Sequence, residues 1–75
     1  MNQSQRLIEF GRIIRKARQA KGLTQEQLAE LCHYNATYIS MLERGQRNPP
    51  FTTLCILARV LDIPLHKLLK DFKDK

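Results

Sequence analysis

Apolar residues recur at intervals of three and four positions in several stretches of the chain, which is the spacing of helices with one buried face. The first stretch covers about residues 4–21, with apolar positions at Leu7, Phe10, Ile14 and Ala17. Gly22 follows and predicts the end of this helix, because glycine readily adopts the left-handed conformation of a helix C-terminus. The first element is therefore predicted to be an amphipathic helix.

Two short helices are predicted next. Thr24 and Gln27 have the spacing of a capping box, in which each side chain satisfies the other residue's backbone amide, so a second helix starts at Gln25. We expect this helix to last two turns, with one apolar face made by Leu28, Leu31 and Cys32. Asn35 is a good N-cap for a third helix from Ala36 to about Arg44, which Gly45 closes.

Two further helices are predicted after a polar loop at residues 46–50. A helix over residues 51–61 has apolar positions at Leu54, Leu57, Ala58 and Leu61. Pro64 should stop it, because proline disfavours the helical conformation of the preceding Ile63, and it can itself open a last helix. That helix repeats the spacing at Leu65, Leu68, Leu69 and Phe72, and residues 73–75 look like a frayed charged tail. With no strand pattern, the prediction is a single all-α domain over residues 1–75.

The link between the second and third helices is the most informative feature. Three residues join them, and so short a link makes the helices cross steeply, as in a helix-turn-helix. Ala29 supplies a small residue for the crossing, while Ile39 and Leu42 supply apolar anchors. With Ile39 inward and 100° per residue, the outward face holds Thr37, Ser40, Met41 and Arg44, with Ala36 and Tyr38 on its flanks.

The composition narrows the function. The chain has 75 residues and a net charge of +6, from 13 Lys and Arg against 7 Asp and Glu. A domain this small buries only a small hydrophobic core, so its stability is marginal and dimerisation would increase it. For the same reason, a deep substrate cleft is not expected. No apolar run is long enough to cross a membrane, and the N-terminal stretch has no secretory pattern, so we expect a cytoplasmic protein.

The residues that carry metal or catalytic chemistry are scattered. Cys32 and Cys55 lie far apart in apolar helical stretches. His33 and His66 are likewise far apart, and none of the four residues has the spacing of metal ligands. We expect the two cysteines to be core thiols. The sequence predicts no cofactor, no metal site, no catalytic residue and no enzymatic activity.

The segment GLTQEQLAELCHYNATYISMLERGQRNPP resembles the helix-turn-helix of phage repressor and Cro proteins and their xenobiotic-response-element-type bacterial relatives. The resemblance covers about residues 10–69 and implies a five-helix lambda-repressor-like fold that binds double-stranded DNA. Within this family, TYIS with ERG-x-RN is similar to restriction-modification controller proteins, while DIPLHKLL is similar to small stand-alone repressors. The sequence leaves this choice open.

The resemblance also implies roles for individual residues. Gln25 would contact a phosphate at the positive end of the second helix. The base-reading positions would be Ala36, Thr37, Ser40 and Met41, with Tyr38 as a further candidate. Phosphate contacts after the third helix would come from Arg44, Arg47 and Asn48. A structural ion pair would join Arg18 and Glu43.

Three positions depart from the family pattern. His33 stands where the family usually has a left-handed glycine, a conformation that histidine tolerates at some strain. Ala36 stands where controller proteins often have arginine, so a bidentate guanine contact is lost there. Pro50 and Pro64 replace serine caps, which predicts weaker capping of the last two helices.

Two hypotheses for the function follow. In the first, the chain is a transcriptional regulator that binds a pseudo-palindromic operator as a homodimer, with an interface formed by Leu65, Leu68, Leu69 and Phe72. In the second, it is an antitoxin or adaptor-type module whose main partner is another protein. Position 36 is alanine and not arginine or asparagine, so the predicted base-reading face is weak, and this keeps the second hypothesis open.

Overall fold

The computed structural model describes residues 4–69, and within this range the chain forms five α-helices and no strand. In chain order they are α1 (Ser4–Ala20), α2 (Gln25–Cys32), α3 (Ala36–Glu43), α4 (Phe51–Leu61) and α5 (Leu65–Leu69). The predicted all-α fold is therefore confirmed, with helix boundaries that differ by about a residue in this range. The last predicted apolar position, Phe72, and the predicted tail lie outside the described residues.

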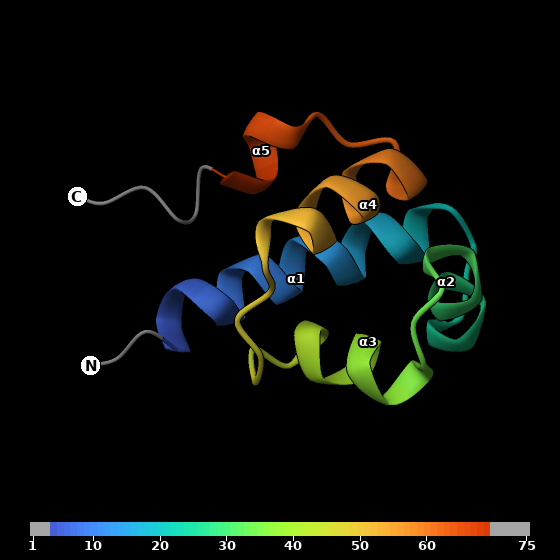
Figure 1. Cartoon of the computed structure of the whole chain (residues 1–75), viewed down its shortest axis with the longest axis horizontal. Coiled ribbons are helices and arrows are strands. Elements are labelled where there is room, and N and C mark those ends of the chain that lie inside the picture. Colours follow the sequence, from blue (N-terminus) through green and yellow to red (C-terminus); the bar gives the residue numbers. More distant parts are fainter. Residues whose placement is uncertain (1–3, 70–75) are drawn as a thin grey trace.

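The helices pack around α1, which contacts both α3 and α4 (Figure 1). α2 packs against α3 and α4, and the short α5 packs against α4. In Figure 1, α3 and α5 lie on opposite sides of α1 and α4. This arrangement leaves one side of α3 facing solvent, away from the rest of the domain.

The caps of α2 and α3 form as the sequence predicts. Thr24 Oγ1 accepts a hydrogen bond from the Gln27 amide at 3.0 Å, and the Thr24 amide donates to Gln27 Oε1 at 2.9 Å. At the start of α3, Asn35 Oδ1 accepts from the Tyr38 amide at 2.8 Å. Pro50 gives α4 no side-chain cap. Each cap satisfies a backbone amide that the first helical turn leaves without a partner.

α4 ends at Leu61, as the sequence predicts, but the residue that caps it is Asp62. Asp62 adopts the left-handed conformation, with φ 62°, and the amide of Ile63 donates to the carbonyl oxygen of Ala58 at 2.9 Å. This hydrogen bond closes the helix in the manner of a C-terminal cap. The last helical residue, Leu61, therefore lies two residues before Ile63, the position that Pro64 restricts, and the left-handed Asp62 caps the helix.

The core is formed by one face of each helix. The side chains with no exposed surface are Phe10, Ile14, Leu28, Ile39, Leu42, Leu57 and Leu68. In α2 the predicted apolar face was wrong at Leu31, which is 55% exposed, because the buried face consists of Leu28, Ala29 and Cys32. Leu31 lies roughly 100° from the centre of that face at 100° per residue. Cys55 is only half-buried, so of the two predicted core thiols only Cys32 is one.

Gly11 allows α1 and α3 to approach closely. A Cβ atom at this position would lie 2.5 Å from the carbonyl oxygen of Leu42 and closer still to that of Glu43. Real side chains do not tolerate such contacts with backbone atoms, so a glycine in the middle of α1 sets the distance to the C-terminal end of α3.

Candidate nucleic-acid interface

Helices α2 and α3 form the predicted helix-turn-helix. Ala29 is 2% exposed, and Ile39 and Leu42 are fully buried, so the small residue and both anchors lie inside the domain. His33 has φ 63° and ψ 38°, which is the left-handed conformation expected at this position. The amide of Tyr34 then donates to the carbonyl oxygen of Ala29 at 2.8 Å, which closes the turn. The link therefore directs α3 across α2.

The outward face of α3 carries small and mixed side chains. Thr37 and Arg44 are exposed, and four further positions are half-buried, namely Ala36, Tyr38, Ser40 and Met41. This agrees with the face predicted from 100° per residue. All five predicted base-reading positions therefore keep some accessible surface.

An open hollow lies beside this face of α3. It is lined by His33, Tyr34, Asn35, Thr37, Tyr38, Met41 and Arg47. Three of the predicted base-reading residues thus share one concave surface with one of the predicted phosphate-binding cations. The inter-helix residues His33, Tyr34 and Asn35 also line it, and sequence reasoning did not assign them to the site. Their position in the short link was the signal that could have placed them there.

The predicted phosphate-binding residues after α3 are exposed at Arg44, Arg47 and Asn48. Arg44 Nε donates to the carbonyl oxygen of Ser40 at 3.3 Å, and Arg47 Nε donates to Met41 Sδ at 3.5 Å. Both hydrogen bonds use the Nε atom, so neither of them uses the terminal Nη nitrogens of Arg44 or Arg47. Their charge stays beside the outward face of α3.

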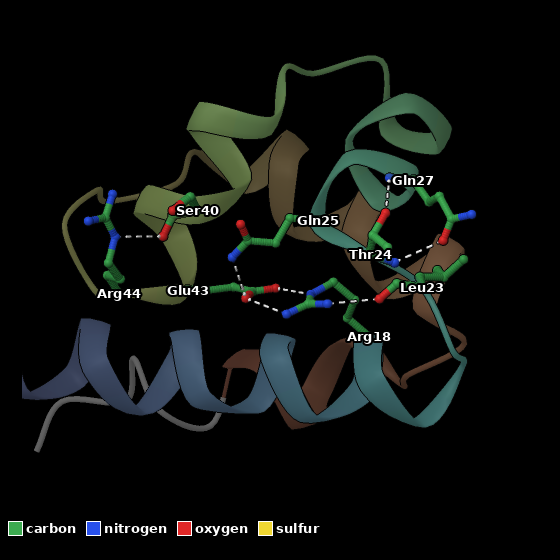
Figure 2. Close-up of polar contacts among 8 residues, drawn as sticks. All are labelled: Arg18, Leu23, Thr24, Gln25, Gln27, Ser40, Glu43 and Arg44. Carbon is green, nitrogen blue, oxygen red and sulfur yellow. Dashed lines mark hydrogen bonds and ion pairs between the residues drawn. The ribbon is translucent and has the colours of Figure 1, made fainter.

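A buried ion pair joins α1 to α3 behind this face. Arg18 Nε lies 2.6 Å from Glu43 Oε2, and Arg18 Nη2 donates to Glu43 Oε1 at 3.0 Å (Figure 2). Arg18 Nη1 also donates to the carbonyl oxygen of Leu23 at 2.8 Å. Both residues are 9% exposed, so the two charges compensate each other in a place with little water.

Gln25 takes part in the same network. Its Nε2 donates to Glu43 Oε1 at 3.0 Å, and Figure 2 shows its side chain directed toward that carboxylate. Sequence reasoning did not foresee this bond. A side-chain amide carries two N–H donors, so one remains for a phosphate while the other holds Glu43. The phosphate contact of Gln25 stays a prediction.

The described residues contain no cluster of three or more potential metal ligands. Neither Cys32 nor Cys55 forms a disulfide. Burial raises the pKa of the Cys32 thiol above its usual value, which keeps this thiol protonated and unreactive. In the described part of the chain, no helix is both long and apolar enough to cross a membrane.

The steeply crossed helix pair, the outward face of α3 and the flanking cations together define a helix-turn-helix DNA-binding domain. Comparison with known proteins agrees, since the family model described as helix-turn-helix matches residues 14–68. The chain therefore belongs to the helix-turn-helix family, in its Cro/C1-type branch, whose matching members are transcriptional regulators and controller proteins and not enzymes.

Three relatives illustrate the similarity. The control protein C.SmaI of Serratia marcescens is 45% identical over 56 residues, which are 75% of this chain and 67% of that protein. The crystal structure of the restriction-modification controller protein C.AhdI from Aeromonas hydrophila shares 40% identity with a TM-score of 0.83, over 91% of this chain and 99% of that one. The biofilm regulator SinR in complex with DNA shares 34% identity with a TM-score of 0.75, over 80% and 97%.

The chain spans smaller shares of longer relatives, including 44% of the regulator DdrOP3 of Deinococcus deserti. The chain is thus a transcriptional regulator with a helix-turn-helix DNA-binding domain.

Proposed function

We propose that the protein binds a specific pseudo-palindromic operator as a homodimer, with α3 of each protomer in the major groove. The observation that carries the proposal is the hollow that brings Thr37, Tyr38 and Met41 together beside Arg47. The two α3 helices would read half-sites about 34 Å apart, one turn of the DNA duplex. The similarity to C.SmaI and C.AhdI supports a controller-type regulator.

Base reading would rest on small and apolar contacts. Ala36 offers no hydrogen bond, so Thr37 and Ser40 would supply hydroxyl groups and Met41 an apolar contact to a thymine methyl group. Tyr38 would add an aromatic ring at the edge of the same surface. These contacts distinguish bases by shape as well as by hydrogen bonds.

Phosphate contacts would hold α3 in register. Arg44 and Arg47 flank the C-terminal end of the helix, and Asn48 follows in the exposed loop. At the other side, the second N–H of the Gln25 amide and the N-terminus of α2 would hold another phosphate. Such contacts raise affinity for every sequence and therefore make binding sensitive to salt.

The dimer interface would form on α5. Leu65 and Leu69 are half-buried and keep apolar surface, whereas Leu68 is fully buried against the core of its own chain. Leu68 therefore has no surface to offer a partner, which corrects its predicted place in the interface. Phe72, the fourth predicted interface residue, lies outside the described residues. α5 lies on the opposite side of the domain from α3, so it can pair while both α3 helices remain accessible (Figure 1).

The test is selection of bound fragments from a random duplex library at about 150 mM salt, where electrostatic binding without sequence preference is weakened. We expect enrichment of a two-fold related pair of half-sites. Enrichment of a single half-site would contradict the homodimer. Recovery of no sequence above background, together with fixed-ratio co-purification of another protein from the native host, would instead favour the adaptor-type role.

A further inference from the structure

We propose that Tyr34 is a positioning residue for base reading, which holds the ring of Tyr38 through a hydrogen bond that Tyr34 makes to Thr53 of α4. This inference rests on the proposed function. It gives Thr53, which lies outside the helix-turn-helix, an influence on the base specificity of α3. It links three residues that come from the inter-helix link, α3 and α4.

The first contact is the hydrogen bond between Tyr34 and Thr53. The Tyr34 hydroxyl lies 2.8 Å from Thr53 Oγ1, across 19 positions of the sequence. Thr53 is only 2% exposed, so its hydroxyl has little access to water, and loss of the bond would leave a buried polar group without this partner. The far end of the Tyr34 side chain is therefore fixed to the N-terminal turn of α4.

The second contact is between the two aromatic rings. The ring centroids of Tyr34 and Tyr38 lie 5.0 Å apart with an angle of 62° between the ring planes, which is the favoured edge-to-face arrangement. The backbone of Tyr38 is separately held by Asn35, which accepts its amide hydrogen bond at 2.8 Å. The backbone of Tyr38 is thus held by Asn35, and its ring packs against a neighbouring ring that is itself held in place.

The third observation is where this pair lies. Tyr34 and Tyr38 both line the hollow that also contains Thr37, Met41 and Arg47. A shift of the Tyr34 ring would change the wall of this hollow and free the Tyr38 ring to rotate. The Thr53 hydroxyl, which faces the interior, would in this way influence the surface that meets the bases.

The test repeats the duplex selection with variants. Tyr38→Ala first identifies the base positions whose selection depends on the Tyr38 ring. We expect Tyr34→Phe and Thr53→Val each to relax selection at those same positions by about threefold to tenfold, the range that an aromatic pair contact supports. Thr53→Ser, which keeps the hydroxyl, should retain the selection of the unaltered protein. In the Tyr38→Ala background, Thr53→Val should cause no further loss of selection.

Thr52→Val is the matched control. Thr52 is the exposed neighbour of Thr53, and this change should alter neither selectivity nor stability. Retained selection in both Tyr34→Phe and Thr53→Val, whatever their thermal stability, would overturn the positioning role. Absence of any selectivity in the unaltered protein would instead overturn the proposed function, and this inference with it.

A measurement without DNA examines the linkage itself. The chain contains 2 Tyr, so its tyrosine ring signals come from this pair alone. We expect nuclear Overhauser contacts between the two rings in the unaltered protein and their loss in Thr53→Val, with recovery in Thr53→Ser. Unchanged contacts between the rings in Thr53→Val would overturn the proposed linkage.

Discussion

The Arg18 guanidinium holds the Glu43 carboxylate through two hydrogen bonds, with Nε 2.6 Å from Oε2 and Nη2 3.0 Å from Oε1. The pair ties the C-terminal half of α1 to the last residue of α3. Through Gln25 it also reaches the first residue of α2. One carboxylate therefore connects all three helices that position the outward face of α3 (Figure 2).

Removing one partner of this pair should destabilise the domain strongly. We expect Arg18→Met to lower the free energy of unfolding by about 3–5 kcal/mol, because it leaves a buried carboxylate without its compensating charge. The double variant Arg18→Met with Glu43→Leu should lose much less. Urea unfolding followed by circular dichroism measures both. Equal losses in the single and double variants would contradict a charge-compensating role for the pair.

Two glycines should respond differently to substitution. Gly11→Ala should destabilise by about 1–3 kcal/mol, because its Cβ meets backbone atoms of α3, although alanine itself favours a helix. Gly22 has φ 72° and open space around its Cα, so Gly22→Ala should lose about 1 kcal/mol from backbone strain alone. Asparagine tolerates this conformation, so Gly22→Asn should recover part of the loss. Thermal unfolding compares the three, and a stabilising Gly11→Ala would contradict the close contact.

Substitutions at the proposed base-reading residues and at the proposed phosphate-binding residues should have different effects on DNA binding. The first should change sequence preference, and the second should lower affinity for every sequence. Thr37→Ala and Met41→Ala should change which duplexes are preferred, because we propose that these side chains contact the bases. Arg47→Ala should weaken binding to every duplex and reduce the slope of log affinity against log salt by about one. Arg59→Ala, an exposed change on α4, is the control for lost charge. Equal losses on all duplexes for Thr37→Ala would contradict its role in base reading.

The proposed dimer interface on α5 predicts that a substitution there changes the mass of the protein in solution. Leu69→Glu should shift the protein toward the monomer, because it places a charge on the apolar surface of α5. Leu31→Glu is the matched control, since Leu31 is 55% exposed on α2, away from the proposed interface. Sedimentation velocity measures association, and circular dichroism checks that both variants remain folded. A dimer that persists in Leu69→Glu would move the interface away from α5.

The sequence by itself determined the helices and their caps. Apolar spacing and the Thr24 and Asn35 caps are local signals, since a helix satisfies its hydrogen bonds within a few residues. The three-residue link between Cys32 and Ala36 likewise set the steep crossing. Spacing from Ile39 placed Thr37, Ser40 and Met41 on the outward face for the same reason.

The tertiary structure alone decided features that depend on contact between distant helices. Leu31 looked as apolar as Leu28, but only the packing of α2 settled which of them is buried. Leu68 and Leu69 are likewise both apolar, and only the packing of α5 shows that Leu68 is fully buried whereas Leu69 is half-buried. Gly11 carries no local sign of its role, because the close approach comes from α3. The bonds from Gln25 to Glu43 and from Tyr34 to Thr53 join residues 18 and 19 positions apart, a separation at which local pattern carries no information.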